Sequence, residues 1–345
     1  MPVFNVEELA GYAKSIFVGY GVPEDEAQIV AAALADANLA GHDSHGVIRV
    51  SQYIDWLEHG ILVPKAEITI MQDTDNLAMI TGNYGFGQII GRWAMEIGIK
   101  KAKKCGFAIV GLKHSGHLGR MGDYPAMAVK EELLSLHFIN THGGGKLVAP
   151  FGGSERRMSA NPIAAGIPIK GESPVIVDFS TAAIAGGKVY VAHNRGLQIP
   201  EGCALNRFGE PTTDPSDFVE GEGALLNFGG HKGFALGLLC DILAGALCGA
   251  PCSSPESDRV ANAMLSIILD PGIFRDKDGF YAEVTRYLAY VKSSALRPGF
   301  EEILYPGEPE MRTAAKRSAS GIVIDDQTWS EMVAAGLRYG VTIGA

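Results

Sequence analysis

The first forty residues have the spacing of apolar positions that is typical of amphipathic helices. The pattern predicts helices within residues 6–40, with Val6-Glu7-Glu8-Leu9 opening the first and Pro23-Glu24-Asp25-Glu26 opening the second. Acidic residues in a first turn and proline close to it are common at helix starts. Gly41 fits the end of the second helix, because glycine takes the left-handed conformation there without cost.

After residue 75 the pattern changes to short apolar runs separated by glycine and proline, which predicts strands. The expected strands are residues 77–80, 108–112, 136–139, 164–169 and 175–178. A helix is expected at about 88–105, a buried helix at 232–250, an apolar segment at 261–269, and a return to helix from Arg312. The chain is therefore expected to mix α and β structure.

Composition narrows the class of protein. The chain has 345 residues, of which 47% are hydrophobic and 20% charged, so it can form two domains and is too apolar to be disordered. The formal charge of −10 argues against a nucleic-acid partner, because phosphate binding needs a basic face. An anionic substrate must therefore be bound by locally placed cations.

The expected location is the cytoplasm. The N-terminal residues lack the basic start and apolar run of a signal peptide, and the longest apolar region, 234–247, is interrupted by glycine and Asp241. No membrane span is expected. The five cysteines are scattered and suggest reduced thiols rather than a disulfide framework. They are Cys105, Cys203, Cys240, Cys248 and Cys252.

The segment from Gly41 to Arg49 carries the densest chemistry in the chain. It places a carboxylate, a hydroxyl, two imidazoles and a guanidinium within nine residues that follow a predicted helix. His45 can exchange a proton near neutral pH, and Arg49 can bind a carboxylate through two parallel hydrogen bonds. This segment is the first candidate for an active site.

A glycine-rich turn at Gly85-Phe86-Gly87, with Gly91 beyond it, lies between a predicted strand and helix. Such a turn could hold the pyrophosphate of a dinucleotide. The third glycine comes one residue late, however, and the next strand ends in Lys113-His114 without an acidic residue for a ribose hydroxyl. A packing role for these glycines is favoured.

Two histidine pairs have the same spacing, His42 with His45 and His114 with His117. Together they could form a four-ligand metal site, which would make the protein a metal-dependent hydrolase. Neither pair has the acidic residue of a known zinc-binding helix, and both lie in predicted loops. The metal site is therefore kept as an alternative and is not favoured, and no metal ligands are assigned.

These residues belong to a series of motifs that runs along the whole chain. The motifs are Asp43-Ser44-His45-Gly46-Val47-Ile48-Arg49, Gly82-Asn83-Tyr84-Gly85-Phe86-Gly87-Gln88, Ser115-Gly116-His117-Leu118-Gly119, Asn161-Pro162-Ile163-Ala164, Val177-Asp178-Phe179-Ser180-Thr181, Ile199-Pro200-Glu201-Gly202, Pro211-Thr212-Thr213-Asp214-Pro215, Phe228-Gly229-Gly230-His231-Lys232-Gly233 and Pro306-Gly307-Glu308. In these motifs and their order the chain resembles the type-2 malate/L-lactate dehydrogenase family. That family is unrelated to the ordinary lactate dehydrogenases. It includes ureidoglycolate, sulfolactate and diketogulonate oxidoreductases and the Δ1-piperideine-2-carboxylate reductases.

The resemblance implies an α+β fold that is not Rossmann-like, with a mixed, largely antiparallel sheet that binds a nicotinamide cofactor. It implies a homodimer whose active sites lie close to the subunit interface. Three regions are expected. Residues 1–75 and 310–345 form a helical region for dimerisation and substrate, residues 76–230 form the NAD(P)-binding sheet domain, and residues 231–309 form a helical region that completes the active site.

The resemblance also implies roles for particular residues in exchanging a hydride between the cofactor and a small 2-hydroxy or 2-oxo acid. His45 corresponds to the proton donor, with Ser44 and Asp178 orienting and polarising it. A carboxylate behind the His45 ring would fix its tautomer. Arg49 corresponds to the carboxylate clamp. Apart from the resemblance, Arg120 and Tyr53 are also expected to bind the substrate. His117 lies where some family members place the acid/base, so which histidine donates stays open.

The cofactor-binding positions implied by the resemblance fall in five segments of the chain. They are His117, Leu118, Gly119, Arg120, Met121, Thr141, Asp178, Phe179, Ser180, His231, Lys232, Pro306, Gly307 and Glu308. NAD is slightly preferred over NADP. Ser154, Arg156 and Arg157 could bind a 2′-phosphate, but Glu155 among them would repel it.

The chain departs from the commonest family pattern near His117. His114 replaces an asparagine, Arg120 and Asp123 stand where small or apolar residues are usual, and His231 stands where tyrosine is common. A polar pocket with extra basic groups indicates a substrate with hydroxyls or a second carboxylate. Reduction of a cyclic imino acid, which has a C=N bond, is the alternative within the same family.

Overall fold

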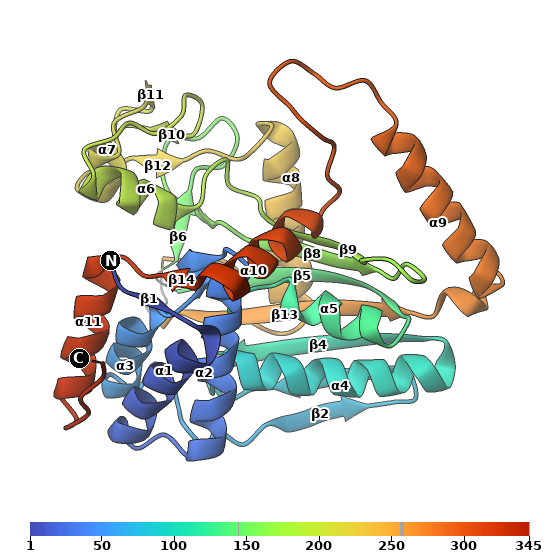
Figure 1. Ribbon diagram of the computed structural model, residues 1–345, viewed down its shortest axis with the longest axis horizontal. Coiled ribbons are helices and arrows are strands. Elements are labelled where there is room, and N and C mark those ends of the chain that lie inside the picture. The colour runs from blue at the N-terminus through green and yellow to red at the C-terminus, as the bar shows by residue number, and fades with distance from the viewer. Residues whose placement is uncertain (144, 256–258, 345) are drawn as a thin grey trace.

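The structure is a computed structural model that describes residues 1–143, 145–255 and 259–344. Figure 1 shows a helical region that holds both chain ends, a large central sheet, a smaller sheet region above the helical one, and a helix that stands away from the body.

Within the described residues the central sheet has seven strands, and only β3 and β4 pair in parallel there. In sheet order the strands are β2 (Thr69–Asp73), β3 (Leu77–Thr81), β4 (Phe107–Ser115), β13 (Ala261–Leu269), β5 (Leu134–His142), β8 (Pro162–Ile167) and β9 (Val175–Ser180). Helix α4 (Gly87–Cys105) joins the parallel pair, and α5 (Asp123–Lys130) follows β4. The expected mixed, largely antiparallel sheet is confirmed. The apolar segment 261–269 is a strand of its interior.

The glycines of the turn before α4 are packing glycines. A Cβ on Gly87 would lie 2.2 Å from the carbonyl oxygen of His117, and one on Gly91 would lie 2.4 Å from the ring of Tyr124. Both positions therefore require glycine because the loop after β4 and helix α5 approach α4 closely. This geometry agrees with the packing interpretation of the turn.

The helical region is built from both ends of the chain. Its helices are α1 (Val6–Tyr20), α2 (Glu24–Leu39), α3 (Arg49–Glu58) and α11 (Asp326–Leu337), beside a two-stranded pair of β1 (Val3–Phe4) and β14 (Ile322–Val323). Asn5 and Glu8 form a capping box at the start of α1. The helices share one buried apolar core that includes Leu9, Ile16 and Met332. The helices expected within residues 6–40 are confirmed.

A second, smaller sheet has its own core. Its order is β11 (Pro211–Thr212), β10 (Ala204–Leu205), β12 (Ala224–Leu225), β6 (Lys146–Val148) and β7 (Met158–Ser159). Helices α6 (Gly186–Asn194) and α7 (Ser216–Val219) accompany it. Val148, Val189 and Phe218 are buried in its core, apart from the core of the central sheet.

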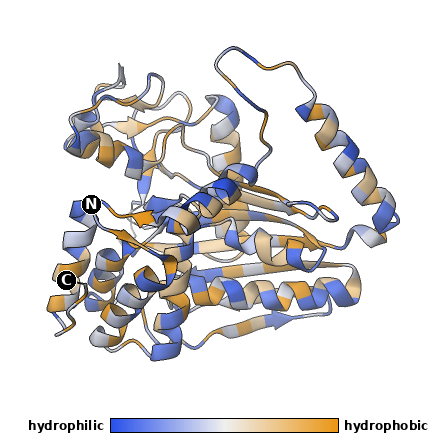
Figure 2. Cartoon of the chain, viewed as in Figure 1, coloured by the Kyte–Doolittle hydropathy of each residue, from blue (hydrophilic) through white to orange (hydrophobic). Residues whose placement is uncertain are grey.

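Three more helices complete the chain. Helix α8 (His231–Cys240) continues into a π-helical turn, Asp241–Ala246, within the predicted buried helix. Helix α9 (Lys277–Lys292) stands away from the body, and Tyr281 is its one buried residue. Helix α10 (Glu308–Ser320) has no buried residue and is largely hydrophilic (Figure 2). Among the described residues, none of the helices combines the length and hydrophobicity that a bilayer crossing requires.

Candidate active site

The loop between α2 and α3 is held in shape by one buried amide. Asn38, which is 2% exposed, accepts a hydrogen bond from the Val47 amide at 2.8 Å and donates one to Asp43 Oδ1 at 2.7 Å. A Cβ on Gly46 would lie 2.1 Å from Asn38 Oδ1, so the loop can close around the amide only with glycine there. The backbone on both sides of His45 is therefore fixed.

Asp43 serves the architecture of the loop. Its two carboxylate oxygens accept hydrogen bonds from the Arg317 guanidinium on α10, at 2.6 and 3.0 Å. Arg317 also donates to the carbonyl oxygen of Asn38. The loop is thus tied to a helix near the other end of the chain.

His45 and His117 stack on each other. Their ring centroids are 5.6 Å apart, and the ring planes differ by 9°. Burial, with the nearby positive charge of Arg49, lowers the pKa of His45 from 6.5 to about 3. Burial and Arg49 likewise hold the pKa of His117 well below its usual range. Both rings are neutral at pH 7, and the Ser44 hydroxyl lies 3.2 Å from His45 Nδ1.

Two nitrogens of the Arg49 guanidinium are hydrogen-bonded within the protein, and the third has no partner among the described residues. Its Nε donates to the carbonyl oxygen of Ser44 at 2.7 Å, and its Nη1 donates to Gln52 Oε1 at 2.6 Å. In the described part of the chain no hydrogen-bond partner contacts Nη2. The Nη1–Nη2 edge can therefore bind a carboxylate with two parallel bonds beside the stacked histidines.

Asp178 lies on β9 and faces the loop after β4. Its Oδ2 accepts a hydrogen bond from the Gly122 amide at 2.7 Å. Burial raises the pKa of Asp178, and the Gly122 hydrogen bond and the charges of His42 and Arg120 act in the opposite direction. Within the described residues, the hydrogen-bonding neighbour of the His45 ring is Ser44, and no hydrogen bond joins the ring to Asp178.

Arg120 and Asp123 form a half-buried ion pair at the same loop. Arg120 Nη1 lies 3.1 Å from Asp123 Oδ1, while Arg120 Nε is buried without a hydrogen-bond partner. Burial raises the pKa of Asp123 to about 6, against the opposing charge of Arg120. The pair therefore holds a cation with an unused donor close to the stacked histidines.

Tyr53 lies behind His117. Its hydroxyl oxygen is 2.7 Å from His117 Nδ1 and 2.8 Å from Gln88 Nε2, and its side chain is only 1% exposed. The expected substrate-binding residue thus contacts one of the histidines rather than open space.

The expected cofactor segments converge on β9. Asp178 holds the loop after β4 through the Gly122 amide, the Ile176 amide donates to the Pro306 carbonyl at 3.0 Å, and the Phe228 amide donates to the Thr181 carbonyl at 3.1 Å. A Cβ on Gly122 would lie 3.2 Å from Arg120 Nη2 and 3.3 Å from Asp178 Oδ2. A side chain at position 122 would therefore crowd both charged groups.

Thr141 is joined to the same site by a buried asparagine. Asn262 on β13 accepts a hydrogen bond from the Leu118 amide at 2.9 Å and donates to Thr141 Oγ1 at 2.8 Å. Of the remaining positions, His231 and Lys232 are exposed at the start of α8, and Glu308 accepts a hydrogen bond from the Tyr305 amide at 2.8 Å. The exposed Lys232 offers a positive charge to an anionic group, whereas the backbone amides named here already donate within the protein.

The expected 2′-phosphate residues have structural roles. Arg156 donates to the carbonyl oxygens of Gly223 and Phe218, both at 2.6 Å, and its guanidinium lies 4.4 Å from the centre of the Phe218 ring. Arg157 pairs with Glu155. Two of the three residues that could favour NADP are therefore engaged within the protein.

The four histidines of the metal alternative are not gathered into one group. His42 lies 3.5 Å from Glu310, and His114 stacks on Tyr84 at 5.1 Å, while His45 and His117 stack on each other. In residues 1–143, 145–255 and 259–344, no cluster of three or more His, Cys, Asp or Glu has the arrangement of a metal site. All five cysteines are unpaired thiols.

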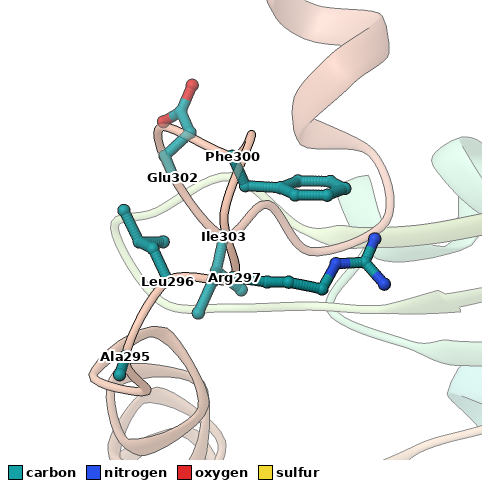
Figure 3. A pocket seen from close by; sticks show the side chains of 6 residues that line it. All are labelled: Ala295, Leu296, Arg297, Phe300, Glu302 and Ile303. Carbon is teal, nitrogen blue, oxygen red and sulfur yellow. The ribbon is translucent and has the colours of Figure 1, made fainter.

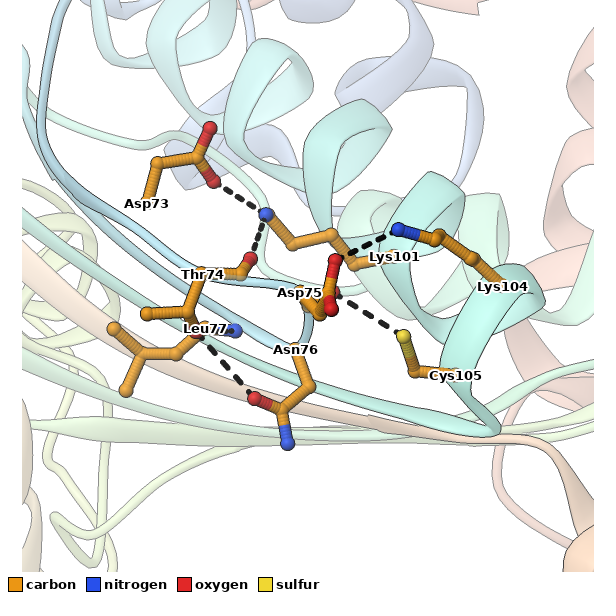
Figure 4. Close-up of polar contacts among 8 residues, drawn as sticks. All are labelled: Asp73, Thr74, Asp75, Asn76, Leu77, Lys101, Lys104 and Cys105. Carbon is orange, nitrogen blue, oxygen red and sulfur yellow. Dashed lines mark hydrogen bonds and ion pairs between the residues drawn. The ribbon is translucent and has the colours of Figure 1, made fainter.

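Two surface hollows lie away from the candidate residues. One, of about 190 Å³, follows α9 and is lined by Ala295, Leu296, Arg297, Phe300, Glu302 and Ile303 (Figure 3). The other, of about 670 Å³, lies between the β2–β3 hairpin and α4, where Lys101 pairs with Asp73 and Lys104 with Asp75 (Figure 4). Exposed pairs of this kind contribute little to stability.

Several residues that build the site were not predicted from the sequence. They are Asn38, Gln88, Asn262 and Arg317. Gln88 falls inside a motif that was recognised, and Asn262 is a polar residue at the start of an apolar run, so each carried a weak signal. Asn38 and Arg317 carried none, because their partners lie far along the chain or in a loop.

Comparison with known proteins identifies the protein family to which the chain belongs. The model of the malate/L-lactate dehydrogenase family matches residues 4–333. The chain belongs to this family and is an oxidoreductase of the hydroxyacid dehydrogenase type.

Individual relatives match over nearly the whole chain. The L-sulfolactate dehydrogenase of Methanothermobacter thermautotrophicus is 38% identical over 327 residues, which cover 93% of this chain and 92% of the relative. The solved structure of the sulfolactate dehydrogenase from Methanocaldococcus jannaschii has a TM-score of 0.88 at 35% identity, covering 99% of this chain and 98% of that one. The Δ1-piperideine-2-carboxylate reductase of Pseudomonas syringae pv. tomato has a TM-score of 0.84 at 28% identity, covering 97% and 100%.

Proposed function

We propose that this protein is an NAD(P)-dependent oxidoreductase that exchanges a hydride between nicotinamide and a small 2-hydroxy or 2-oxo acid. The observation that carries the proposal is the Nη2 group of Arg49, which has no hydrogen-bond partner among the described residues and lies beside the stacked rings of His45 and His117. Arg49 binds the carboxylate of the acid and so places the neighbouring carbonyl against the imidazoles.

The residues proposed to hold the cofactor are those that converge on β9: His117 to Met121, Thr141, Asp178 to Ser180, His231 and Lys232, and Pro306 to Glu308. When bound, the nicotinamide supplies or accepts the hydride, and the protein supplies orientation. The internal contacts of Arg156 and Arg157 support a slight preference for NAD.

His45 is proposed to give a proton to the oxygen that becomes the hydroxyl, and to remove it in the reverse reaction. In the free protein its pKa is lowered to about 3 by burial and by the charge of Arg49. A bound carboxylate offsets the charge of Arg49 and adds a negative charge nearby, so substrate binding raises the pKa of His45 towards the working range.

Arg120 is proposed to contact a second polar or anionic group of the substrate. Its buried, unpaired Nε and its proximity to His45 support this role. The relatives named for sulfolactate act on an acid that carries such a second group. The preferred substrate is therefore a 2-oxo acid with hydroxyls or a second acidic group.

Cyclic imino-acid reduction is the second candidate, favoured by the similarity to the Δ1-piperideine-2-carboxylate reductase structure. It would use the same clamp and proton donor on a C=N bond. A metal-dependent hydrolase is not proposed, because the chain belongs to a dehydrogenase family and its four histidines lie in separate contacts.

A cytoplasmic homodimer is proposed as the working form. The helical region of residues 1–75 and 310–345 is proposed to take part in the dimer. An exposed apolar face on α8 and the following turn also supports dimer formation, because contiguous apolar patches usually mark interaction sites. The face consists of Leu238, Leu239, Ile242 and Leu247. Ile242→Lys should shift the protein to monomer in analytical ultracentrifugation, and an unchanged dimer would contradict the use of this face.

The proposed reaction is tested with purified protein, NADH and NADPH, and a panel of acids. The panel contains pyruvate, oxaloacetate, hydroxypyruvate, diketogulonate and cyclic imino acids, and the readout is loss of the reduced-nicotinamide absorbance. Turnover that is lost in His45→Ala, with cofactor binding retained, is the expected result. Binding of neither cofactor would overturn the proposal.

A further inference from the structure

A chain of three side chains leads from the core of the protein to the active-site histidines. Gln88 is in the first turn of α4 and is 4% exposed, and Tyr53 on α3 is 1% exposed. Gln88 Nε2 lies 2.8 Å from the Tyr53 hydroxyl oxygen, which lies 2.7 Å from His117 Nδ1. This series of side chains ends at the His117 ring, which stacks on His45.

The direction of the hydrogen bonds follows from the number of hydrogens. An amide nitrogen can only donate, so the Tyr53 oxygen accepts from Gln88. The single hydroxyl hydrogen of Tyr53 has no other acceptor among the described residues, so it points to Nδ1 of His117, which therefore accepts. A neutral imidazole that accepts at Nδ1 carries its hydrogen on Nε2.

The opposite orientation of the amide is less favourable. Gln88 Oε1 is buried and has no hydrogen-bond partner in the described part of the chain. Reversing the amide would put Nε2 there and leave both of its hydrogens buried and unpaired. Unpaired buried N–H groups are rarer in proteins than under-satisfied carbonyl oxygens, so the first orientation is preferred.

We propose that Tyr53 and Gln88 are positioning residues that hold His117 in the neutral Nε2–H tautomer. His117 then acts as a fixed hydrogen-bond donor to the substrate oxygen, and His45 is the histidine that carries the transferable proton. This inference rests on the proposed function, and it assigns the role of acid to one of the two imidazoles.

Protonation of His117 would disrupt the hydrogen bonds that join Gln88, Tyr53 and His117. A hydrogen on Nδ1 would face the hydroxyl hydrogen of Tyr53, and the hydroxyl could not turn to Gln88, because a hydrogen of Nε2 already points at its oxygen. Two charged rings stacked at 5.6 Å would also repel each other. Burial and Arg49 hold the pKa of His117 low in the same sense. Burial and Arg49 also lower the pKa of His45, but its hydrogen bond does not oppose protonation, because the Ser44 hydroxyl beside Nδ1 can rotate to donate or accept.

The decisive variant is Gln88→Glu, which is nearly isosteric. An ionised carboxylate can only accept, so Tyr53 would donate to it, and the Tyr53 oxygen would then accept a hydrogen from His117 Nδ1. The tautomer of His117 should therefore reverse at a pH that ionises the introduced carboxyl. Burial raises the pKa of this carboxyl above its usual value. A residue with only a packing role would not produce this reversal.

The measurement is 15N NMR of the imidazole rings in the full-length protein without substrate, over a pH series. In the wild type, the His117 signals should be those of a ring protonated at Nε2. In Gln88→Glu they should change, as pH rises, to those of a ring protonated at Nδ1. His137 is an internal control, because it is buried between Ser135 and Ser266 and its signals should not move. Wild-type signals of an Nδ1–H ring, or signals that stay unchanged in the variant across the series, would overturn the inference.

A second variant tests the link to catalysis. Tyr53→Phe keeps the ring that packs beside Phe17 and Trp56 and removes only the hydroxyl. It should lower kcat by roughly 100-fold, at the low end of acid–base contributions, with KM for the cofactor unchanged. Ser266→Ala, which removes a buried hydroxyl from His137, should leave kcat unchanged. Equal kcat in Tyr53→Phe and wild type would contradict the role. The NMR result does not depend on turnover, so failure of the proposed reaction would be recognised separately.

Discussion

Arg317 on α10 holds Asp43 with two hydrogen bonds, one to each carboxylate oxygen, at 2.6 and 3.0 Å. The contact joins the C-terminal part of the chain to the loop that carries Ser44 and His45. It is a fork-to-fork contact, which fixes orientation as well as distance. The loop's shape therefore depends on a helix that follows it by more than half of the sequence.

Arg317→Lys should weaken this control of the loop. Lysine keeps the charge but has no planar fork, so kcat should fall roughly 10-fold through misplacement of His45. The free energy of unfolding should fall by only about 1 kcal/mol, because Asp43 is half-exposed and solvent screens the pair. Steady-state kinetics and urea unfolding measure the two effects. Arg286→Lys is the control, since Arg286 makes a similar contact with Glu283 on α9, and its kinetics should match the wild type.

Arg49→Lys should separate substrate binding from cofactor binding. The substituted side chain cannot offer two parallel donors, so KM for the acid should rise by roughly 10- to 100-fold, while the cofactor affinity stays the same. Titration of the cofactor by fluorescence and initial rates at varied acid concentration give the two values. An unchanged KM for every acid in the panel would rule out the clamp.

The choice of acid should depend on pH through Asp123. Its pKa is raised to about 6 by burial, so below that pH the carboxyl becomes neutral and leaves the charge of Arg120 uncompensated. The ratio of kcat/KM for a dicarboxylic over a monocarboxylic 2-oxo acid should therefore increase as pH falls through about 6. Asp123→Asn should remove the dependence, and Arg120→Gln should lower the ratio at every pH. A kcat/KM ratio that stays unchanged in both variants would contradict the proposed contact between Arg120 and the substrate.

Buried neutral histidines should make the fold sensitive to mild acid. Burial lowers the pKa of His45 and His137 from 6.5 to about 3, and that of His142 to about 4. The unfolded chain binds more protons than the folded one between these values and 6.5, so stability is full above pH 6.5 and is lost as pH falls below it. Urea unfolding at a series of pH values should show this slope, and His137→Gln should reduce it. A free energy of unfolding that does not change over the window would show that these rings are not held neutral.

Gly46→Ala should damage the loop through a single methyl group. The added Cβ would lie 2.1 Å from Asn38 Oδ1, so the amide would lose its contacts with Asp43 and Val47. We expect a loss of about 2 kcal/mol in the free energy of unfolding, from a buried amide left without partners, and a large loss of kcat. Gly11→Ala in α1 is the matched control, because nothing lies within 4 Å of its Cβ position, and it should be neutral or slightly stabilising.

The sequence was most informative where the signal was local. The helices within residues 6–40, the helix at 88–105 and the strands at 77–80 and 108–112 follow from periodicity, and the structure confirms them. The smaller sheet escaped prediction because most of its strands have only two residues, too few to show an alternating pattern. The segment 261–269 was recognised as apolar, but its length and composition did not distinguish a central strand from a helix.

The candidate site also has a part that the sequence predicts and a part that only the fold brings together. The motif from Asp43 to Arg49 is continuous in sequence, so the chemical groups it offers follow from the residue types alone. The partners that set its behaviour are brought there by the fold, as with Gln88 behind Tyr53 and Asn262 between Leu118 and Thr141. Asp178 was expected behind the His45 ring, and its hydrogen bond to Gly122 depends on the position of a loop that the sequence did not specify.

Strand β9 is the last strand of the central sheet, and the outer edge of such a strand can pair with another chain and start aggregation. Here the Ile176 amide is taken by the Pro306 carbonyl, and a Cβ at Gly307 would lie 3.0 Å from the nitrogen of Ile176. Residues 306–307 therefore cover this edge at Ile176 and are also part of the proposed cofactor site. The same short piece of backbone would therefore line the proposed cofactor site and limit edge-to-edge aggregation of the sheet.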